Sequence, residues 1–327
     1  MNLQFNEKIK EIPITDIEGI RIGHVQDEEG GTGCTVFIAE KGAPCGLDVR
    51  GGGPASRESE LLKPTANADV IHAVLLSGGS AFGLDAAGGV MRYLEEHGIG
   101  FAVGNIRVPL VCQSDIFDLM TADPYARPDQ ALGYEACVNA EKGNYRDGNY
   151  GVGNGATVGK LLGMDFCMKT GIGSYAVQAG DLKVGAVVVV NALGDVYDWK
   201  TGREIAGLLD PSKKHLLSSA DLFYASAYQE PEAAGNTTLA IILTNAKLNK
   251  TQLIKTASLA HNGLARAIRP VHTSADGDSI YAMSLGDVES TSDLVGTLAA
   301  DVLSEAVLKA VYSAESKYGF PSVHEIE

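Results

Sequence analysis

The chain lacks the long apolar run that a membrane-spanning helix requires, and its first residues do not resemble an export signal. No stretch of its 327 residues approaches the roughly 18 consecutive apolar residues of a transmembrane segment. Residues 1–11 carry mixed charge instead of a basic region followed by an apolar one. We therefore expect a protein that is neither exported nor inserted into a membrane.

Basic residues and patterned cysteines are also scarce. The chain has 26 Lys and Arg against 41 Asp and Glu, a net charge of −15. Binding to a nucleic-acid backbone needs clustered Lys and Arg, so this class of partner is not expected. The five cysteines are scattered without CxxC spacing, which predicts reduced thiols packed as small hydrophobes in a cytoplasmic protein. The seven histidines show no HExxH or paired spacing, so the sequence predicts no metal site.

The hydrophobic pattern indicates a large mixed fold. With 45% hydrophobic residues the chain can bury a core as one big domain or two ordinary ones. Short apolar runs bounded by turn residues predict buried strands, at residues 73–76, 184–190, 239–243 and 280–283. Apolar spacings of three and four residues predict helices, at residues 84–94, at 253–268 and from a cap at Ser290 or Thr291 onward. We expect two layers of sheet with helices outside.

The two least periodic and most polar segments are residues 122–147 and 201–234. No helix or strand is assigned to either segment. The second segment is predicted to be an exposed connection, and it ends just before Thr237.

Two glycine-rich segments invite a chemical interpretation that their surroundings weaken. Residues 151–156 match a loose dinucleotide-binding pattern, but no buried strand precedes them, and Gly159-Lys160 fails the P-loop pattern. No cofactor is therefore expected. Ser80 resembles a nucleophile elbow, except that Phe82 stands where the second glycine is needed. We favour Ser80 as the N-cap of the helix that follows it.

The most informative stretch is GNTTLAIILT, residues 235–244, in which a small dipeptide precedes a hydroxyl residue that opens an apolar run. If the bond between Asn236 and Thr237 were cut, Thr237 would carry both a hydroxyl and a free α-amine. The amine could then act as the general base that a lone threonine lacks. The alternative is an ordinary junction between a loop and a strand, since threonine suits a strand start.

A pair of acids, Asp276 and Asp278, stands immediately before the predicted strand at residue 280. The following residues do not supply the oxygen ligands of an EF-hand calcium loop. The pair is either a plain turn or two carboxylates that orient the amine or the proton of a nucleophile.

Seven motifs then occur in one order along nearly the whole chain: ITDIEGIRIGH (14–24), GTGCTV (31–36), RGGGP (50–54) with RE (57–58), LSGGSAFGLDAA (76–87), GNGATVGK (153–160), VGAVVVVN (184–191) and GNTT (235–238). In this order they resemble the DmpA-type aminopeptidases, also called L-aminopeptidase/D-esterases or β-peptidyl aminopeptidases. Members of that family cleave themselves to expose an N-terminal nucleophile.

The resemblance implies roles for particular residues. It implies one self-processing hydrolase domain, 1–327, cut between Asn236 and Thr237 into an α chain, 1–236, and a β chain, 237–327. Thr237 takes the place of the serine nucleophile of the well-known members. Asn191 takes the place of the amide that stabilises the oxyanion, a role that suits a neutral donor. Asp278 takes the place of the family's acid, and Asp276 replaces a serine.

The resemblance also implies an α+β fold, an αββα four-layer sandwich, and a homo-oligomer that is often a tetramer of cleaved protomers. The implied activity is release of N-terminal residues from short peptides, amides or esters through an acyl-enzyme on Thr237. A self-cleaving acyltransferase of the ornithine acetyltransferase kind and a non-catalytic binding protein on the same scaffold remain as alternatives. The preference among L-, D- and β-residues stays open at this stage.

Overall fold

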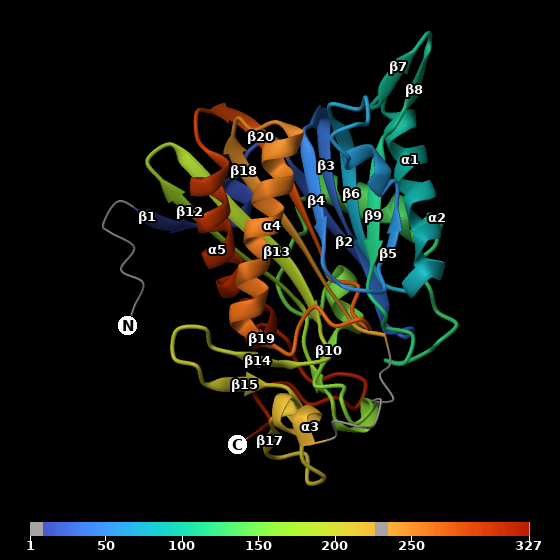
Figure 1. The fold of residues 1–327 in the computed structure, drawn as a ribbon. Helices are drawn as coiled ribbons and strands as arrows, with labels where there is room; N and C mark the ends of the chain where they lie inside the picture. The colour runs from blue at the N-terminus through green and yellow to red at the C-terminus, as the bar shows by residue number, and fades with distance from the viewer. Residues whose placement is uncertain (1–8, 226–234, 327) are drawn as a thin grey trace.

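Two sheets lie face to face in the computed structural model, which describes residues 9–225 and 235–326 (Figure 1). The six-stranded sheet has the order β1 (Ile9–Ile12), β12 (Ile172–Ala179), β13 (Leu182–Asn191), β18 (Thr237–Ala246), β20 (Ser279–Val288), β4 (Cys45–Val49). The five-stranded sheet has the order β2 (Arg21–Asp27), β3 (Thr32–Ala43), β6 (Ile71–Ser77), β9 (Val111–Asp115), β5 (Ala55–Arg57). The four predicted strand cores lie in β6, β13, β18 and β20, so those predictions are confirmed.

Helices cover the outer face of each sheet. α4 (Lys250–Ala267) and α5 (Ser292–Tyr312) pack on the six-stranded sheet, and α1 (Ala86–Glu96) and α2 (Gln130–Glu141) pack on the five-stranded one. Alternation along β13 shows the layering, because successive side chains of a strand point to opposite faces. Val188 and Val190 belong to the core under α4 and α5, whereas Val187 and Val189 belong to the core between the sheets. The predicted αββα sandwich is therefore confirmed.

The shorter elements fill the connections. The remaining strands are β7 (Phe101–Val103), β8 (Ile106–Val108), β10 (Thr157–Val158), β11 (Met168–Lys169), β14 (Asp195–Tyr197), β15 (Glu204–Ala206), β16 (Leu208–Leu209), β17 (Leu216–Leu217) and β19 (Ile268–Arg269). The others are helix α3 (Ser219–Ala225) and 3-10 helices η1 (Ile14–Asp16), η2 (Ser59–Leu62), η3 (Ser80–Asp85), η4 (Gly151–Gly155) and η5 (Met164–Phe166). Within the described part of the chain, every helix falls short of the length or the apolar character that crossing a membrane demands.

The helix caps match the sequence in one place and differ in another. Thr291 caps α5, since its side chain accepts a hydrogen bond from the amide of Leu294. The prediction that Ser80 is an N-cap is wrong. Ser80 begins η3 at φ +52° without a side-chain cap, and its amide donates to the carbonyl of Ile116.

Helix α2 lies inside residues 122–147, where the sequence predicted no element. Its buried residues are small, including Gly133 and Ala136, so the segment lacks a recognisable apolar stripe. Close packing explains their size, because a Cβ at Gly133 would stand 2.0 Å from the carbonyl oxygen of Ala86 in α1. Asp129 is the N-cap of this helix, and its carboxylate accepts from two backbone amides.

Residues 201–234 were predicted to be an exposed connection. They contain β15, β16, β17 and α3, and the strands β15 and β16 are largely buried, so that prediction is wrong for 204–209. The part at 226–234 lies outside the described residues. The five cysteines are buried and form no disulfide, as their spacing predicted.

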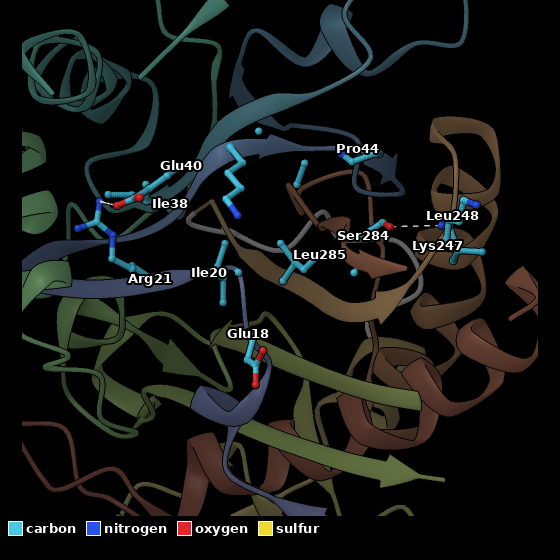
Figure 2. Close-up of a pocket in the computed structure, with 15 residues that line it drawn as sticks. Glu18, Ile20, Arg21, Ile38, Glu40, Pro44, Lys247, Leu248, Ser284 and Leu285 are labelled. Atoms are coloured by element: carbon cyan, nitrogen blue, oxygen red, sulfur yellow. Dashed lines mark hydrogen bonds and ion pairs between the residues drawn. The ribbon is translucent and has the colours of Figure 1, made fainter. Parts of the chain in front are cut away.

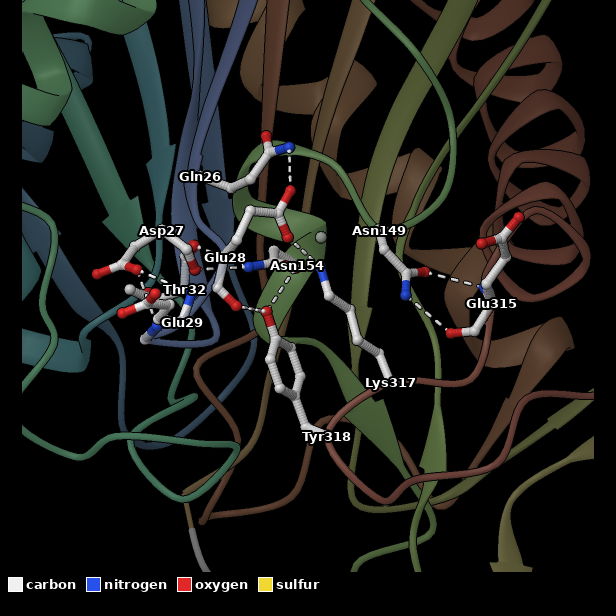
Figure 3. Close-up of polar contacts among 12 residues, drawn as sticks. Gln26, Asp27, Glu28, Glu29, Thr32, Asn149, Asn154, Glu315, Lys317 and Tyr318 are labelled. Carbon is white, nitrogen blue, oxygen red and sulfur yellow. Dashed lines mark hydrogen bonds and ion pairs between the residues drawn. The ribbon is translucent and has the colours of Figure 1, made fainter.

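The segment after α5 ties the C-terminal region to the turn between β2 and β3 (Figure 3). Lys317 donates from Nζ to Oδ1 of Asn154 over 2.8 Å and pairs with Glu28, while the hydroxyl of Tyr318 donates to the Glu28 carbonyl over 2.8 Å. Asn154 in turn donates to the carbonyl of Thr32. These contacts fix η4, which leads into the candidate site.

Candidate active site

Thr237 is the first residue of β18, an interior strand of the six-stranded sheet, and two neighbouring strands bring the other candidate residues to it. On one side Asn191, the last residue of β13, stands opposite Thr237 in the antiparallel register. On the other side β20 runs parallel to β18, with Ser279 opposite Leu239, so the turn before β20 reaches Thr237. The sheet thus gathers the four residues that the sequence singled out.

The carbonyl of Asn236 accepts two hydrogen bonds at this edge of the sheet. One comes from the backbone amide of Gly277 over 2.8 Å, and the other comes from the Thr237 hydroxyl itself. Gly277 lies so close that a Cβ there would stand 2.6 Å from Oγ1 of Thr237. The candidate nucleophile and an amide donor therefore both face the carbonyl of the candidate cleavage site, although the side-chain amide of Asn236 is buried and has no hydrogen-bond partner among the described residues.

The two acids hold different groups. Asp278 accepts from the amide of Thr238 at Oδ1 over 2.7 Å, and its Oδ2 accepts from both the amide and the Nδ1 of His272, over 3.0 and 2.8 Å. Asp276 accepts from the amide of Thr273 over 2.6 Å. Burial raises the pKa of the Asp276 carboxyl to about 6, and the nearby charge of Asp278 acts in the same direction.

Asn191 is fully buried and uses both ends of its side-chain amide. Its Oδ1 accepts from Nζ of Lys160 over 2.5 Å and from the amide of Thr157 over 3.2 Å, and its Nδ2 donates to the carbonyl of Phe117 over 2.9 Å. Before any cleavage of the chain, three hydrogen bonds thus hold the side-chain amide of Asn191 in place. To stabilise the oxyanion of a substrate, Nδ2 must break its hydrogen bond to the Phe117 carbonyl and donate to the oxyanion instead.

Lys160 is a site residue that the sequence interpretation missed. It is 2% exposed, and burial lowers the pKa of its ammonium to about 8 against the opposing charges of Asp276 and Asp118. The sequence signal is its place at the end of GNGATVGK, one of the seven ordered motifs, although no role in the site was predicted for the lysine itself. A second buried lysine, Lys169, bonds to backbone carbonyls instead, among them those of Gly153 and Ala156.

Asp118 is another buried carboxylate, and it lies close to Lys160. Its Oδ2 accepts from the hydroxyl of Thr32 over 2.6 Å, and its Oδ1 accepts from the amide of Gly79 over 2.7 Å. Burial raises the pKa of this carboxyl to about 6, and its hydrogen bonds oppose the shift. The glycine-rich segment at 76–87 therefore bonds to Asp118 through the amide of Gly79, while the amide of Ser80 donates to the carbonyl of Ile116.

A cavity of about 670 Å³ lies at the end of the sandwich opposite to Thr237. Figure 2 shows the residues that line it. Its lining includes Lys247 and Leu248, which follow the last residue of β18, and Leu285 from the second half of β20. Thr237 is the first residue of the same ten-residue strand. The cavity is therefore separate from the cluster around Thr237.

Known proteins resemble this chain over most of its length. An uncharacterized aminopeptidase of Mycobacterium leprae is 38% identical over 94% of this chain and 92% of its own length. A 6-aminohexanoate-oligomer endohydrolase of Paenarthrobacter ureafaciens is 32% identical over 90% of this chain and 84% of its own. Among solved structures, the L-aminopeptidase D-Ala-esterase/amidase of Ochrobactrum anthropi, a variant of the Ntn hydrolase fold, aligns with a TM-score of 0.69.

That structural alignment has 18% sequence identity and covers 96% of this chain and 90% of the other. A Burkholderia sp. beta-aminopeptidase aligns with a TM-score of 0.65 at 19% identity, over 94% of this chain and 88% of the other. The likeness to the Ochrobactrum anthropi structure shows that the four-layer sandwich has the fold of that protein, a variant of the Ntn hydrolase fold. The profile of peptidase family S58 matches residues 13–324, and the chain therefore belongs to that family.

Proposed function

We propose that this peptidase cleaves itself between Asn236 and Thr237 and then works as an aminopeptidase and amidase with Thr237 as its N-terminal nucleophile. One observation carries the proposal: the Thr237 hydroxyl and the Gly277 amide both donate to the carbonyl oxygen of Asn236. A nucleophile and an oxyanion donor at the same peptide carbonyl are the two requirements of acyl transfer.

Self-cleavage follows from this geometry in two steps. Oγ1 of Thr237 attacks the carbonyl carbon of Asn236, and the Gly277 amide stabilises the oxyanion. The C–N bond breaks, the hydroxyl proton passes to the departing nitrogen, and an ester joins Asn236 to Oγ1. Water then hydrolyses the ester, which leaves a carboxylate on Asn236 and a free α-amine and hydroxyl on Thr237.

Turnover of a substrate uses the same groups. Oγ1 of Thr237 attacks the carbonyl of the substrate's first residue while the new α-amine takes the proton, and its ordinary pKa near 8 suits a base at neutral pH. Asp278, bonded to the next amide along β18, holds this end of the strand. Asn191 and the Gly277 amide meet the oxyanion, the leaving amine or alcohol takes the proton, and water hydrolyses the acyl-enzyme.

We propose short peptides, amides and esters as substrates. The named activities of similar proteins support this breadth, since they cover an aminopeptidase, a beta-aminopeptidase and a 6-aminohexanoate-oligomer endohydrolase. A panel of L-, D- and β-residue p-nitroanilides with a linear 6-aminohexanoate dimer and trimer measures the preference. Hydrolysis of none of them by the cut protein contradicts the proposed substrate class.

Denaturing mass spectrometry tests the central claim. Two fragments that meet between Asn236 and Thr237 support it, and a single uncut chain supports the binding protein instead. Thr237→Ala is expected to abolish both the cut and all hydrolysis, while Thr237→Ser retains both. If hydrolysis appears only when an amine acceptor such as ornithine is added, the acyltransferase is the correct alternative.

We also propose that the protein is a cytoplasmic homo-oligomer, a tetramer of cleaved protomers. The hairpin of β7 and β8 supports association because it exposes Phe101, Val103 and Ile106, and an isolated two-stranded hairpin is only marginally stable. The five unbridged cysteines support the location. Light scattering after gel filtration measures the oligomer, and Ile106→Lys is expected to shift it toward the monomer.

A further inference from the structure

His272 has an unusual conformation beside the candidate acid. Its φ is +60°, in the left-handed region that residues other than glycine rarely adopt. This conformation directs two donors of one residue, the backbone amide and Nδ1, to the same atom, Oδ2 of Asp278. Strain of this kind persists where the surrounding structure requires it, and it is concentrated at functional sites.

The hydrogen bonds assign the proton of the imidazole. An ionised carboxylate can only accept, so we place a proton on Nδ1 of His272. Nε2 is buried and finds no hydrogen-bond partner in residues 9–225 and 235–326, and the ring packs edge to face against His261 with 4.7 Å between centroids. The only side-chain hydrogen bond of the His272 ring among the described residues is therefore the one to Asp278.

Asp278 connects this imidazole to the nucleophile. Its Oδ2 is occupied by His272, and its Oδ1 accepts from the amide of Thr238, which is bonded directly to Thr237. Rotation of the carboxylate would break both contacts together. The orientation of the first residue of β18 thus depends on a residue that touches no reacting atom.

We propose that His272 is a positioning residue, which fixes the Asp278 carboxylate and through it the Thr237 nucleophile for self-cleavage and turnover. The inference rests on the proposed function of Thr237. It adds a member to the site that neither the sequence patterns nor the candidate residues contained. The alternative is that His272 only completes the turn between β19 and β20.

Two substitutions separate these explanations. His272→Gly keeps the left-handed backbone and the amide donor but removes the ring. His272→Asn tolerates the same conformation and restores an N–H donor near the position of Nδ1. His24→Asn is the matched control, because His24 is also buried and hydrogen-bonded, to the hydroxyl of Thr35, in another part of the fold.

The experiment measures the rate of self-cleavage and the kcat and KM of the cut enzyme on an amino-acid p-nitroanilide. His272→Gly is expected to slow self-cleavage and kcat roughly 10- to 100-fold with KM little changed, since a hydrogen bond to a charged group is lost. His272→Asn and added imidazole are each expected to recover most of that loss. The control is expected to keep the wild-type rates.

Each result decides between the explanations. Wild-type rates in His272→Gly overturn the inference, and so does a slow His272→Gly that neither asparagine nor imidazole improves and whose melting temperature falls in parallel. A wild-type protein that never cuts itself contradicts the proposed function instead, which keeps the two failures distinct.

Discussion

Asn191 and Thr237 stand directly opposite each other where β13 ends and β18 begins. They are 46 residues apart in the sequence, yet the antiparallel register makes them neighbours. The same end of the sheet receives the turn with Asp276 and Asp278, because β20 runs parallel to β18. The site is therefore a consequence of strand order: the proposed nucleophile lies between an amide on one strand and a pair of acids before the other.

Substitution of Asn191 tests the first half of this arrangement. Asn191→Ala removes the donor proposed for the oxyanion, so kcat is expected to fall about a hundred- to a thousandfold, as is typical for such a donor. The same change leaves the Lys160 ammonium and the Phe117 carbonyl without their partner, so melting is measured beside the kinetics. A folded variant with wild-type kcat contradicts the assigned role.

Substitution of Gly277 tests the position of the Thr237 hydroxyl by steric displacement, without changing any charge. In Gly277→Ala the new Cβ would stand 2.6 Å from Oγ1 of Thr237, so the hydroxyl must move away from the Asn236 carbonyl. Self-cleavage is expected to slow by about a hundredfold, since a displacement of about 1 Å has that effect on a reacting group. The rate of self-cleavage is followed by denaturing gel electrophoresis of the protein after its rapid synthesis.

The matched control for Gly277→Ala is Gly53→Ala. A Cβ at Gly53 meets nothing closer than 3.8 Å, although it lies against the same turn, near the carbonyls of Ser274 and Asp276. Gly53→Ala is expected to cleave at the wild-type rate. Equal slowing in both variants would show that the turn as a whole, and not the contact with Oγ1, controls the reaction.

Much of this site could be predicted from the sequence because its parts are local. The apolar runs marked β13, β18 and β20, and the residues at their ends, Asn191, Thr237 and Asp278, are those that motif order singled out. What the sequence could not provide was the set of contacts between distant segments. Lys160 contacts Asn191 only because the fold brings two separate segments together. The donor of Gly277 is its backbone amide, which every residue but proline has, so no residue type in the sequence marks it.

The errors have the same physical origin. Helix α2 was missed because its buried face consists of small residues that the close approach of α1 demands, a property of the pair and not of either segment. Ser80 was expected to cap a helix from its position alone. In the fold its amide bonds to the Ile116 carbonyl, and the preceding Gly79 donates to Asp118, so tertiary contacts set this turn.

Lys160 should matter more for the reaction than for stability. Lys160→Met removes the ammonium that holds Oδ1 of Asn191, so kcat is expected to fall roughly 10- to 100-fold, the effect of one charged hydrogen bond. Lys169→Met is the matched control, since this equally buried lysine bonds to backbone carbonyls such as that of Gly153. The control is expected to melt at a lower temperature with little change in kcat; equal slowing of both variants contradicts a specific role.

Asp276 gives a prediction for the pH dependence of stability. Its pKa is about 6 in the folded chain and close to 3.9 when unfolded, so between these values the folded state binds more protons. The contribution of Asp276 to the free energy of unfolding therefore falls as pH rises from 4 to 6, by on the order of 3 kcal/mol in total. Asp276→Asn cannot ionise, and it keeps an oxygen for the Thr273 amide.

The Asp276 comparison is best made in a Thr237→Ala background, where both chains stay uncut. Urea unfolding at several pH values is expected to show that Asp276→Asn gains stability over its parent as pH rises from 4 to 7. Asp210→Asn is the control, because hydrogen bonds from Ser212 lower the pKa of this exposed carboxyl, so its contribution to stability changes only below about pH 4 and its difference from the parent is expected to stay nearly constant from pH 4 to 7. A difference between Asp276→Asn and its parent that stays constant across this range contradicts a buried, proton-binding carboxyl beside Thr237.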